Sequence, residues 1–133
     1  MIGVVAISHG GMSTGIKSSA HVLLGEDKPQ FEAVELLLDD SPEVFFNKLN
    51  EAVAKVDTGD GVIVFADLFG GTPCNQSINI MSDRIKLVSG MNFPMIIEVL
   101  CSREFKGGIE EFDLDELVAI GQDGIKDVFK ALS

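Results

Sequence analysis

The chain alternates between short, continuous apolar runs and longer segments in which apolar residues recur at helical spacing. Two of the runs, Ile2 to Ile7 and Val62 to Ala66, are rich in Val and Ile, which predicts strands buried on both faces of a parallel sheet. A third run, Phe31 to Leu38, is interrupted by two glutamates, which favours an edge strand. Ile85 to Val88 is predicted to be the fourth strand.

Helical patterns separate these strands. The apolar positions between Met12 and Leu24 have helical spacing and stop at Gly25, a typical C-terminal cap. Ser41-Pro42-Glu43 predicts another helix start, with a capping hydroxyl, a proline at the first helical position and an acid in the first turn. Three more helices are predicted. One begins at Thr72-Pro73, one begins around Asn92-Phe93-Pro94 and runs toward Cys101, and one spans Leu114 to Ile120.

This alternation of strand and helix predicts a single α/β domain over residues 1–133, with a parallel sheet, helices on both faces and right-handed crossovers. Because the two most apolar strands should be central, the predicted order is 2-1-3-4, a flavodoxin-like, doubly wound arrangement. The last segment, Ile125 to Leu132, is isolated by two glycines and could be a short strand or a final helical turn. We favour a strand.

Two polar side chains stand where the central strands end. His9 follows the first run and Asp67 follows the third strand, and in open parallel sheets ligands gather at this carboxyl edge. Taken alone, His9 could be an ordinary loop residue and Asp67 could cap the next turn. Because their strands are predicted to be neighbours, we expect the two side chains to lie within hydrogen-bonding distance. Their convergence at the predicted switch point favours a functional role.

A carboxylate beside an imidazole accepts one ring N–H and leaves the other nitrogen as a nucleophile. The segment Gly70-Gly71-Thr72 opens a helix, so its amides can hold an anion. Gly10-Gly11 offers a second set of amides before the first helix, with the hydroxyls of Ser13 and Thr14 nearby. Together these features predict a histidine that accepts a phosphoryl group and passes it on.

Charge and composition limit the classes of partner, the cellular location and the cofactors to be expected. The formal net charge of −11 excludes nucleic acid and disfavours anionic membranes, but it suits a basic protein partner. No apolar window suggests a membrane span and the start lacks a signal peptide, so we expect a cytoplasmic protein without direct membrane insertion. Cys74 and Cys101 lack metal-ligand spacing and are expected to be reduced thiols. We expect neither a metal nor a cofactor.

Several segments carry a family resemblance. Ile7-Ser8-His9-Gly10, Leu23-Leu24-Gly25, Gly90 to Met95 and, above all, Asp67 to Asn75 (DLFGGTPCN) resemble the IIA component of the mannose-family sugar phosphotransferase system. The similarity extends over nearly the whole chain. The resemblance therefore supports the fold and the chemistry expected from the residues alone.

The resemblance implies that His9 is transiently phosphorylated, on Nε2, by the phosphohistidine of the carrier protein HPr. His9 would then pass the group to a histidine of a IIB component, on a separate polypeptide, which serves the membrane components IIC and IID. Asp67 would hold the Nδ1–H, and Gly10, Gly70, Gly71 and Thr72 would surround the phosphate. The family further implies a homodimer in which the C-terminal strand, here Ile125 to Leu132, is exchanged between subunits.

Other functions remain open. Within the same family, a phosphotransfer subunit of a dihydroxyacetone kinase is the nearest alternative. A receiver-like switch phosphorylated on Asp67 would need an acidic pair after the first strand, where this chain has Ser8 and His9. A flavin or nucleotide module would need aromatic stacking, and the chain contains neither Trp nor Tyr. The transported sugar is not specified by these residues, and His21 is expected to be a surface residue.

Overall fold

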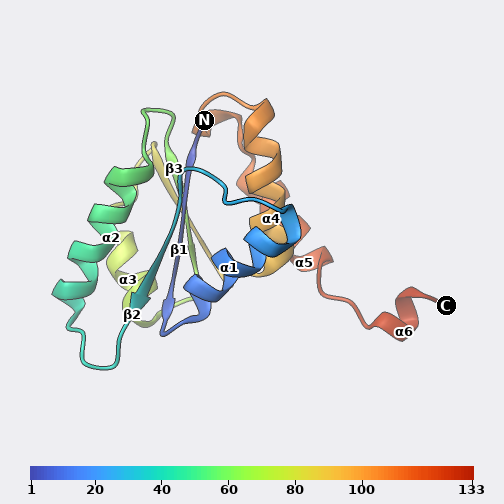
Figure 1. The fold of residues 1–133 in the computed structure, drawn as a ribbon, viewed down its shortest axis with the longest axis horizontal. Helices are drawn as coiled ribbons and strands as arrows, with labels where there is room; N and C mark the ends of the chain where they lie inside the picture. Colours follow the sequence, from blue (N-terminus) through green and yellow to red (C-terminus); the bar gives the residue numbers. More distant parts are fainter.

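The computed structural model describes all 133 residues and contains one parallel four-stranded sheet (Figure 1). The strands are β1 (Gly3–His9), β2 (Phe31–Leu36), β3 (Val62–Ala66) and β4 (Ile85–Ser89). Their order is β2-β1-β3-β4, and all three pairings are parallel. The predicted order 2-1-3-4 is therefore confirmed, with β2 at one edge.

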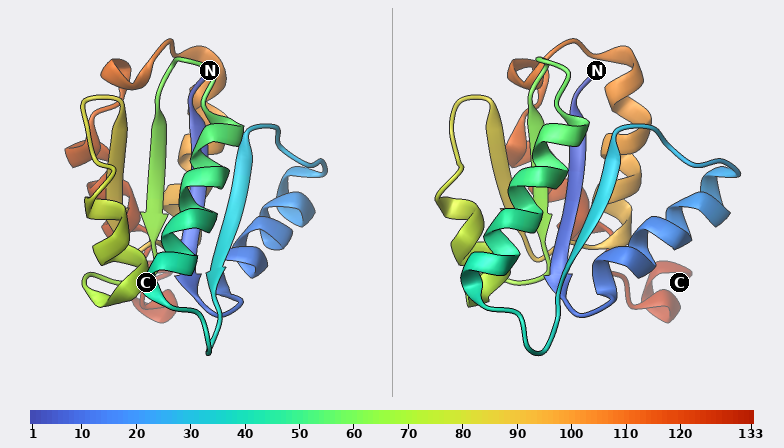
Figure 2. Two further views of the ribbon diagram at one scale, coloured as in Figure 1. Left: turned by 90° about the vertical axis from the view of Figure 1, so that its left-hand side faces the viewer. Right: turned by 60° about the vertical axis from the view of Figure 1, so that its left-hand side comes forward.

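Helices cover both faces of the sheet. Figures 1 and 2 show α2 and α3 on one face, and α1, α4 and α5 on the other. The helices are α1 (Met12–Leu24), α2 (Pro42–Val56), α3 (Gly71–Ile78), α4 (Phe93–Ser102), α5 (Leu114–Asp123) and α6 (Val128–Ala131), with short 3-10 turns at Arg103–Phe105 and Ile109–Glu111. None of these helices is long and apolar enough to cross a lipid bilayer.

The central strands are buried because their two faces belong to two different cores. Val4 and Ala6 of β1 pack with α4, whereas Val5 and Ile7 pack with α2. Alternate side chains of a strand point to opposite faces, so a strand between two helical layers must be apolar throughout. This explains the unbroken apolar runs at the centre of the sheet.

Most predicted helix boundaries are confirmed by their caps. The Ser41 hydroxyl accepts a hydrogen bond from the Val44 amide, and Gly25 closes α1 in the left-handed conformation. The start of α3 differs from the expectation. Gly70 precedes the helix with φ +84° and ψ −176°, a conformation open essentially to glycine alone, so the helix begins at Gly71 and Thr72 is its second residue.

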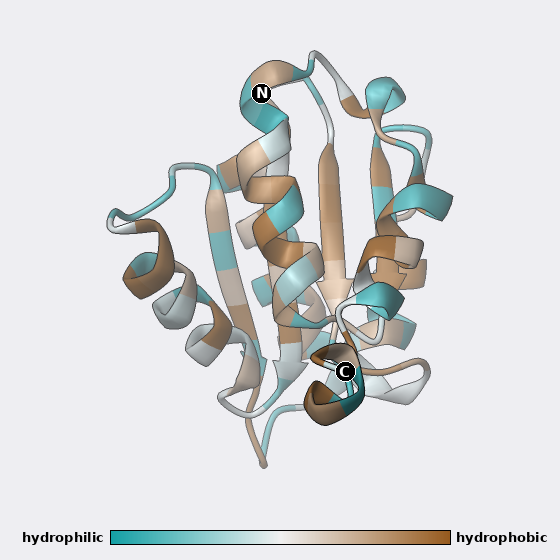
Figure 3. Cartoon of the chain, turned by 90° about the vertical axis from the view of Figure 1, so that its right-hand side faces the viewer, coloured by the Kyte–Doolittle hydropathy of each residue, from teal (hydrophilic) through white to brown (hydrophobic).

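The predicted C-terminal strand is absent from this single chain. Ile125 to Leu132 instead forms an extended connector and the four-residue helix α6, which the Asp127 carboxylate caps at the Lys130 amide. A strand requires a hydrogen-bonded neighbour, and the segment projects away from the sheet (Figure 1). Figure 3 shows that much of this projecting segment is hydrophobic. Its exposed apolar side chains are Ile125, Val128, Phe129 and Leu132.

Candidate functional site

His9 and Asp67 meet at the carboxyl edge of the sheet, as predicted. His9 ends β1, and Asp67 follows β3, which pairs directly with β1 (Figure 2). The Asp67 Oδ2 atom lies 2.7 Å from His9 Nδ1 and also accepts the backbone N–H of His9 at 2.9 Å. The His9 side chain is 46% exposed, whereas that of Asp67 is 8% exposed. The imidazole is thus accessible from solvent while its carboxylate partner is shielded.

The surroundings of Asp67 favour its charged form. Burial alone would raise the pKa of the carboxyl, but the hydrogen bonds from the amide and ring of His9, aided by the Leu68 amide, lower that pKa below its ordinary value. An ionised carboxylate can only accept hydrogen bonds, so Nδ1 of His9 must carry the ring proton in this pair. Nε2 is then left with a free lone pair.

Gly71 lies directly against the imidazole of His9. A Cβ atom at position 71 would lie 2.9 Å from Cε1 and 3.1 Å from Nε2, closer than ordinary van der Waals contact. Gly71 also has φ +77°, where side chains are strained. Both features require glycine here. With glycine at position 71, the backbone at the start of α3 approaches the Cε1–Nε2 edge of the imidazole.

The N-terminus of α3 is open to an anion. No side chain caps this helix, and the first-turn amides of any helix have no acceptor within it. Because Gly71 lies against the His9 ring, the N-terminus of α3, with the positive end of its dipole, faces the imidazole. This arrangement fits a phosphoryl group attached to Nε2.

The N-terminus of α1 is less open than the sequence suggested. The Gly10 amide donates to Leu36 O at 2.9 Å, and the Ser13 amide donates to Ser8 Oγ at 2.8 Å. The Ser13 hydroxyl is buried and donates to Val34 O, so it does not reach the site. Of the second set of amides expected around the phosphate, Gly10 is already committed to the sheet.

The second histidine also faces a carboxylate. His21, in the last turn of α1, has its Nδ1 beside Oδ1 of Asp27 in the following loop, and both side chains are exposed. This end of a helix presents carbonyl oxygens, which repel anions. The pair thus has an imidazole and a carboxylate, as at the His9 site, but no helix N-terminus beside them. Asp27 as the partner of His21 was not foreseen from the sequence.

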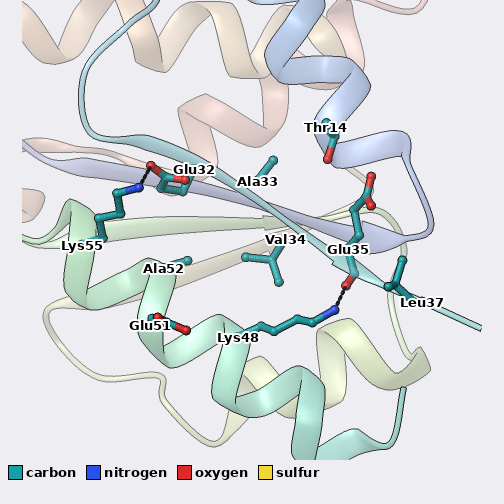
Figure 4. A pocket seen from close by; sticks show the side chains of 10 residues that line it. All are labelled: Thr14, Glu32, Ala33, Val34, Glu35, Leu37, Lys48, Glu51, Ala52 and Lys55. Atoms are coloured by element: carbon teal, nitrogen blue, oxygen red, sulfur yellow. Dashed lines mark hydrogen bonds and ion pairs between the residues drawn. The ribbon is translucent and has the colours of Figure 1, made fainter. Parts of the chain in front are cut away.

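A separate cavity of about 380 Å³ lies along the free edge of β2, between α1 and α2 (Figure 4). Charged side chains line much of this cavity, and both of its lysines are already paired. Lys55 forms an ion pair with Glu32, and Lys48 donates to Glu35 O and to Asp40. Neither His9 nor Asp67 lines this cavity, so it is distinct from the imidazole–carboxylate site.

Comparisons with known proteins show the family of this chain. The EIIA-man family model, described as the PTS system fructose IIA component, matches residues 3–113. The chain is 30% identical, over 94% of its length, to the PTS system mannose-specific EIIAB component of Escherichia coli (strain K12), but it spans only 39% of that relative. It is 28% identical to the PTS system fructose-specific EIIA component of Bacillus subtilis (strain 168), covering 78% of this chain and 72% of that protein.

Solved structures give the same result. The crystal structure of phosphotransferase system component EIIA from Streptococcus agalactiae matches with a TM-score of 0.84 and 25% identity, covering 98% of this chain and 99% of that one. The resemblance to the IIA component of the mannose family is therefore confirmed over most of the sequence. The chain belongs to the EIIA-man family of phosphotransferase-system IIA components.

Proposed function

We propose that this chain is a phosphocarrier of a sugar phosphotransferase system, with His9 as the residue that carries the phosphoryl group. The donor is the phosphohistidine of HPr, and the acceptor is a histidine of a IIB component that serves the membrane components IIC and IID. The observation that carries this proposal is the position of His9 Nε2, between the Asp67-bound half of the ring and the open N-terminus of α3.

The chemistry follows from that position. The lone pair of Nε2 attacks the phosphorus of the donor phosphohistidine as the donor P–N bond breaks and its electron pair returns to the donor imidazole. A new P–N bond then joins phosphorus to Nε2, while the Nδ1 proton stays hydrogen-bonded to Asp67. The Asp67 charge stabilises the ring as it gains positive character. Amides of α3 hold the equatorial oxygens, so catalysis consists mainly of positioning and electrostatics.

The surface around His9 suits a protein donor. Exposed apolar side chains lie at the same carboxyl edge of the sheet as His9, in the segments that follow β1, β2 and β3, and Phe69 is 85% exposed. The exposed side chains are Met12, Leu37, Leu38, Leu68 and Phe69. Apolar residues at the centre of a patch are typical of protein interfaces. Together with the net charge of −11, they favour a partner with an apolar face and a basic margin.

The receiver-like alternative is less favoured by the environment of Asp67. Both carboxylate oxygens already accept hydrogen bonds, from His9 and Leu68, and the side chain is mostly buried. An acceptor aspartate needs a free oxygen that faces the donor. Stability to alkali separates the two products, because phosphohistidine survives base and an acyl phosphate on Asp67 does not.

The proposed homodimer involves the projecting C-terminal segment. Its exposed apolar side chains find no partner within the chain, and a segment of this kind can form a strand when a second subunit offers a sheet edge. We therefore retain the exchange of Ile125 to Leu132 between subunits as part of the proposal.

The proposed relay is tested by reconstitution. Radiolabelled phospho-HPr is mixed with the chain, and the labelled chain is then offered in separate reactions to a IIB component and to a nucleotide-loaded dihydroxyacetone kinase subunit. Transfer to IIB supports the sugar branch, and transfer to the kinase subunit alone assigns the chain to the other branch. The names of the relatives make mannose and fructose the first sugars to test with the membrane components. A chain that takes no label from phospho-HPr contradicts the proposal.

A further inference from the structure

Two fully buried serines lie next to His9 in sequence and in space. The interior of the protein contains very few polar side chains, namely Ser8, Ser13, Ser77 and Arg103. Ser8 is the penultimate residue of β1, and Ser13 lies in the first turn of α1. A buried hydroxyl is costly unless it is hydrogen-bonded, so the contacts of these two serines show what they do.

The Ser8 hydroxyl spans the backbone of His9. It donates to Gly10 O at 2.8 Å and accepts the Ser13 amide at 2.8 Å. The Ser13 hydroxyl in turn donates to Val34 O of β2 at 3.0 Å. Figure 4 shows the first turn of α1, marked by Thr14, beside Val34 and Glu35 of β2. The two hydroxyls therefore connect the end of β1, the start of α1 and the edge strand.

Together with Asp67, these contacts hold the backbone on both sides of His9. Asp67 Oδ2 holds the His9 amide on one side, and Ser8 Oγ holds the carbonyl of Gly10 on the other. Gly10 has φ +59°, which glycine adopts without steric cost but which is only one of the conformations open to it, and the Ser8 hydroxyl ties its carbonyl to the end of β1. Holding the backbone on both sides of the His9 Cα sets the direction of its Cα–Cβ bond. That direction decides whether Nδ1 can reach Asp67 while Nε2 lies beside Gly71.

We propose that Ser8 is a positioning residue for His9, and that Ser13 extends this support to β2. This inference rests on the proposed phosphocarrier function. Ser8 does not touch the phosphoryl group. It acts by holding the turn that aims the ring, so its loss reduces the fraction of encounters in which Nε2 is in line with the donor P–N bond.

The test uses matched variants. Ser8→Thr keeps the hydroxyl, and Ser8→Val introduces a side chain of nearly the same shape as threonine but without the hydroxyl. Ser77→Ala is the control for a buried serine, because Ser77 Oγ donates to a carbonyl, Pro73 O, away from the imidazole. Ser13→Ala removes only the link to Val34. Each variant is checked for folding by thermal unfolding, and single-turnover transfer from phospho-HPr then gives the maximal rate and the half-saturating donor concentration.

We expect Ser8→Val to lower the maximal rate about 10- to 100-fold at an unchanged half-saturating concentration. Ser8→Thr and Ser77→Ala should stay near the wild-type rate, and Ser13→Ala should fall between. Nitrogen NMR of the unphosphorylated protein should show a single Nδ1–H tautomer for His9 in the wild type and a mixture in Ser8→Val. The inference is overturned if Ser8→Val matches Ser8→Thr in rate and tautomer, even when it unfolds at a lower temperature.

The two proposals fail in different ways. If the wild type takes no phosphoryl group from phospho-HPr, the phosphocarrier function is wrong, whatever the serines do. The NMR comparison needs no donor and still measures whether the Ser8 hydroxyl fixes the His9 ring. If the wild type is phosphorylated and the Ser8→Val ring keeps the wild-type tautomer and rate, only the role of Ser8 is wrong.

Discussion

One oxygen of Asp67 binds His9 twice. Oδ2 accepts the backbone amide of His9 at 2.9 Å and lies 2.7 Å from its Nδ1, although the two residues are 58 positions apart in sequence. The hydrogen bond from the backbone amide orients the carboxylate independently of the ring, and the contact with Nδ1 then fixes the imidazole tautomer. A single side chain thus sets both where the histidine stands and which nitrogen is free to react.

Removing that carboxylate should slow phosphoryl transfer without abolishing it. In Asp67→Ala, His9 still presents an imidazole, but both tautomers become populated and the developing ring charge loses its partner. We expect the transfer rate from phospho-HPr to fall on the order of 100-fold. Asp27→Ala, which removes the carboxylate facing His21, is the matched control and should transfer at the wild-type rate. Equal rates for Asp67→Ala and the wild type would show that the contact is not used.

Gly71 should be needed for activity beyond its effect on stability. Gly71→Ala places a methyl group against the His9 ring, and Gly25→Ala introduces the same left-handed strain where nothing lies within 4 Å. We expect both variants to lose stability by about 1–2 kcal/mol. Only Gly71→Ala should also lose transfer rate, by about 10- to 100-fold, because the ring is displaced. Similar rates in the two variants would contradict the close approach of Gly71 to Nε2.

Acid should weaken the fold partly through Asp67. Its pKa is lowered in the folded protein, since the hydrogen bonds from His9 and Leu68 outweigh burial, whereas the pKa of an unfolded aspartate is about 3.9. The unfolded state therefore binds the proton more tightly. The resulting stability is fully present above the unfolded pKa and is lost as the pH falls through the lower, folded pKa.

Asp67→Asn removes this titration. Denaturant unfolding from about pH 5 down to about pH 2 should give a shallower loss of unfolding free energy for Asp67→Asn than for the wild type. Parallel pH profiles for the two proteins would mean that the carboxyl has the same pKa in the folded and unfolded states.

The C-terminal segment should control the association state. Phe129→Ser removes an exposed aromatic side chain from the projecting segment, whereas Lys130→Ser changes its neighbour and leaves that apolar contribution intact. We expect the wild type and Lys130→Ser to sediment as dimers and Phe129→Ser to shift toward the monomer. A monomeric wild type at micromolar concentration would contradict the proposed exchange of Ile125 to Leu132.

The sheet and the meeting of His9 with Asp67 could be predicted because both follow from local patterns. Unbroken apolar runs identify the central strands, and parallel neighbours must end at the same edge. The start of α3 was misplaced at Thr72-Pro73 because the backbone conformation of Gly70, rather than a side-chain cap, begins the helix. That choice depends on the turn geometry, which composition does not reveal.

Other features depend on distant contacts. Arg103 is fully buried and donates to the carbonyls of Ile2, Pro29 and Gln30, which lie 73 to 101 positions earlier in the chain. No local pattern distinguishes it from a surface arginine. The strand expected at Ile125 to Leu132 fails for a related reason, since a strand is defined by its neighbour and this chain alone supplies none to that segment.

The central claim is tested most directly by locating the phosphoryl group. The wild type, His9→Ala and His21→Ala are each incubated with radiolabelled phospho-HPr, treated with alkali and mapped by peptide mass spectrometry. Since His9 is at the exposed edge of the sheet and outside the core, its substitution should leave the protein folded. We predict one alkali-stable phosphoryl group on His9 in the wild type and in His21→Ala, and none in His9→Ala. A folded His9→Ala that still takes up one phosphoryl group per chain would contradict the account.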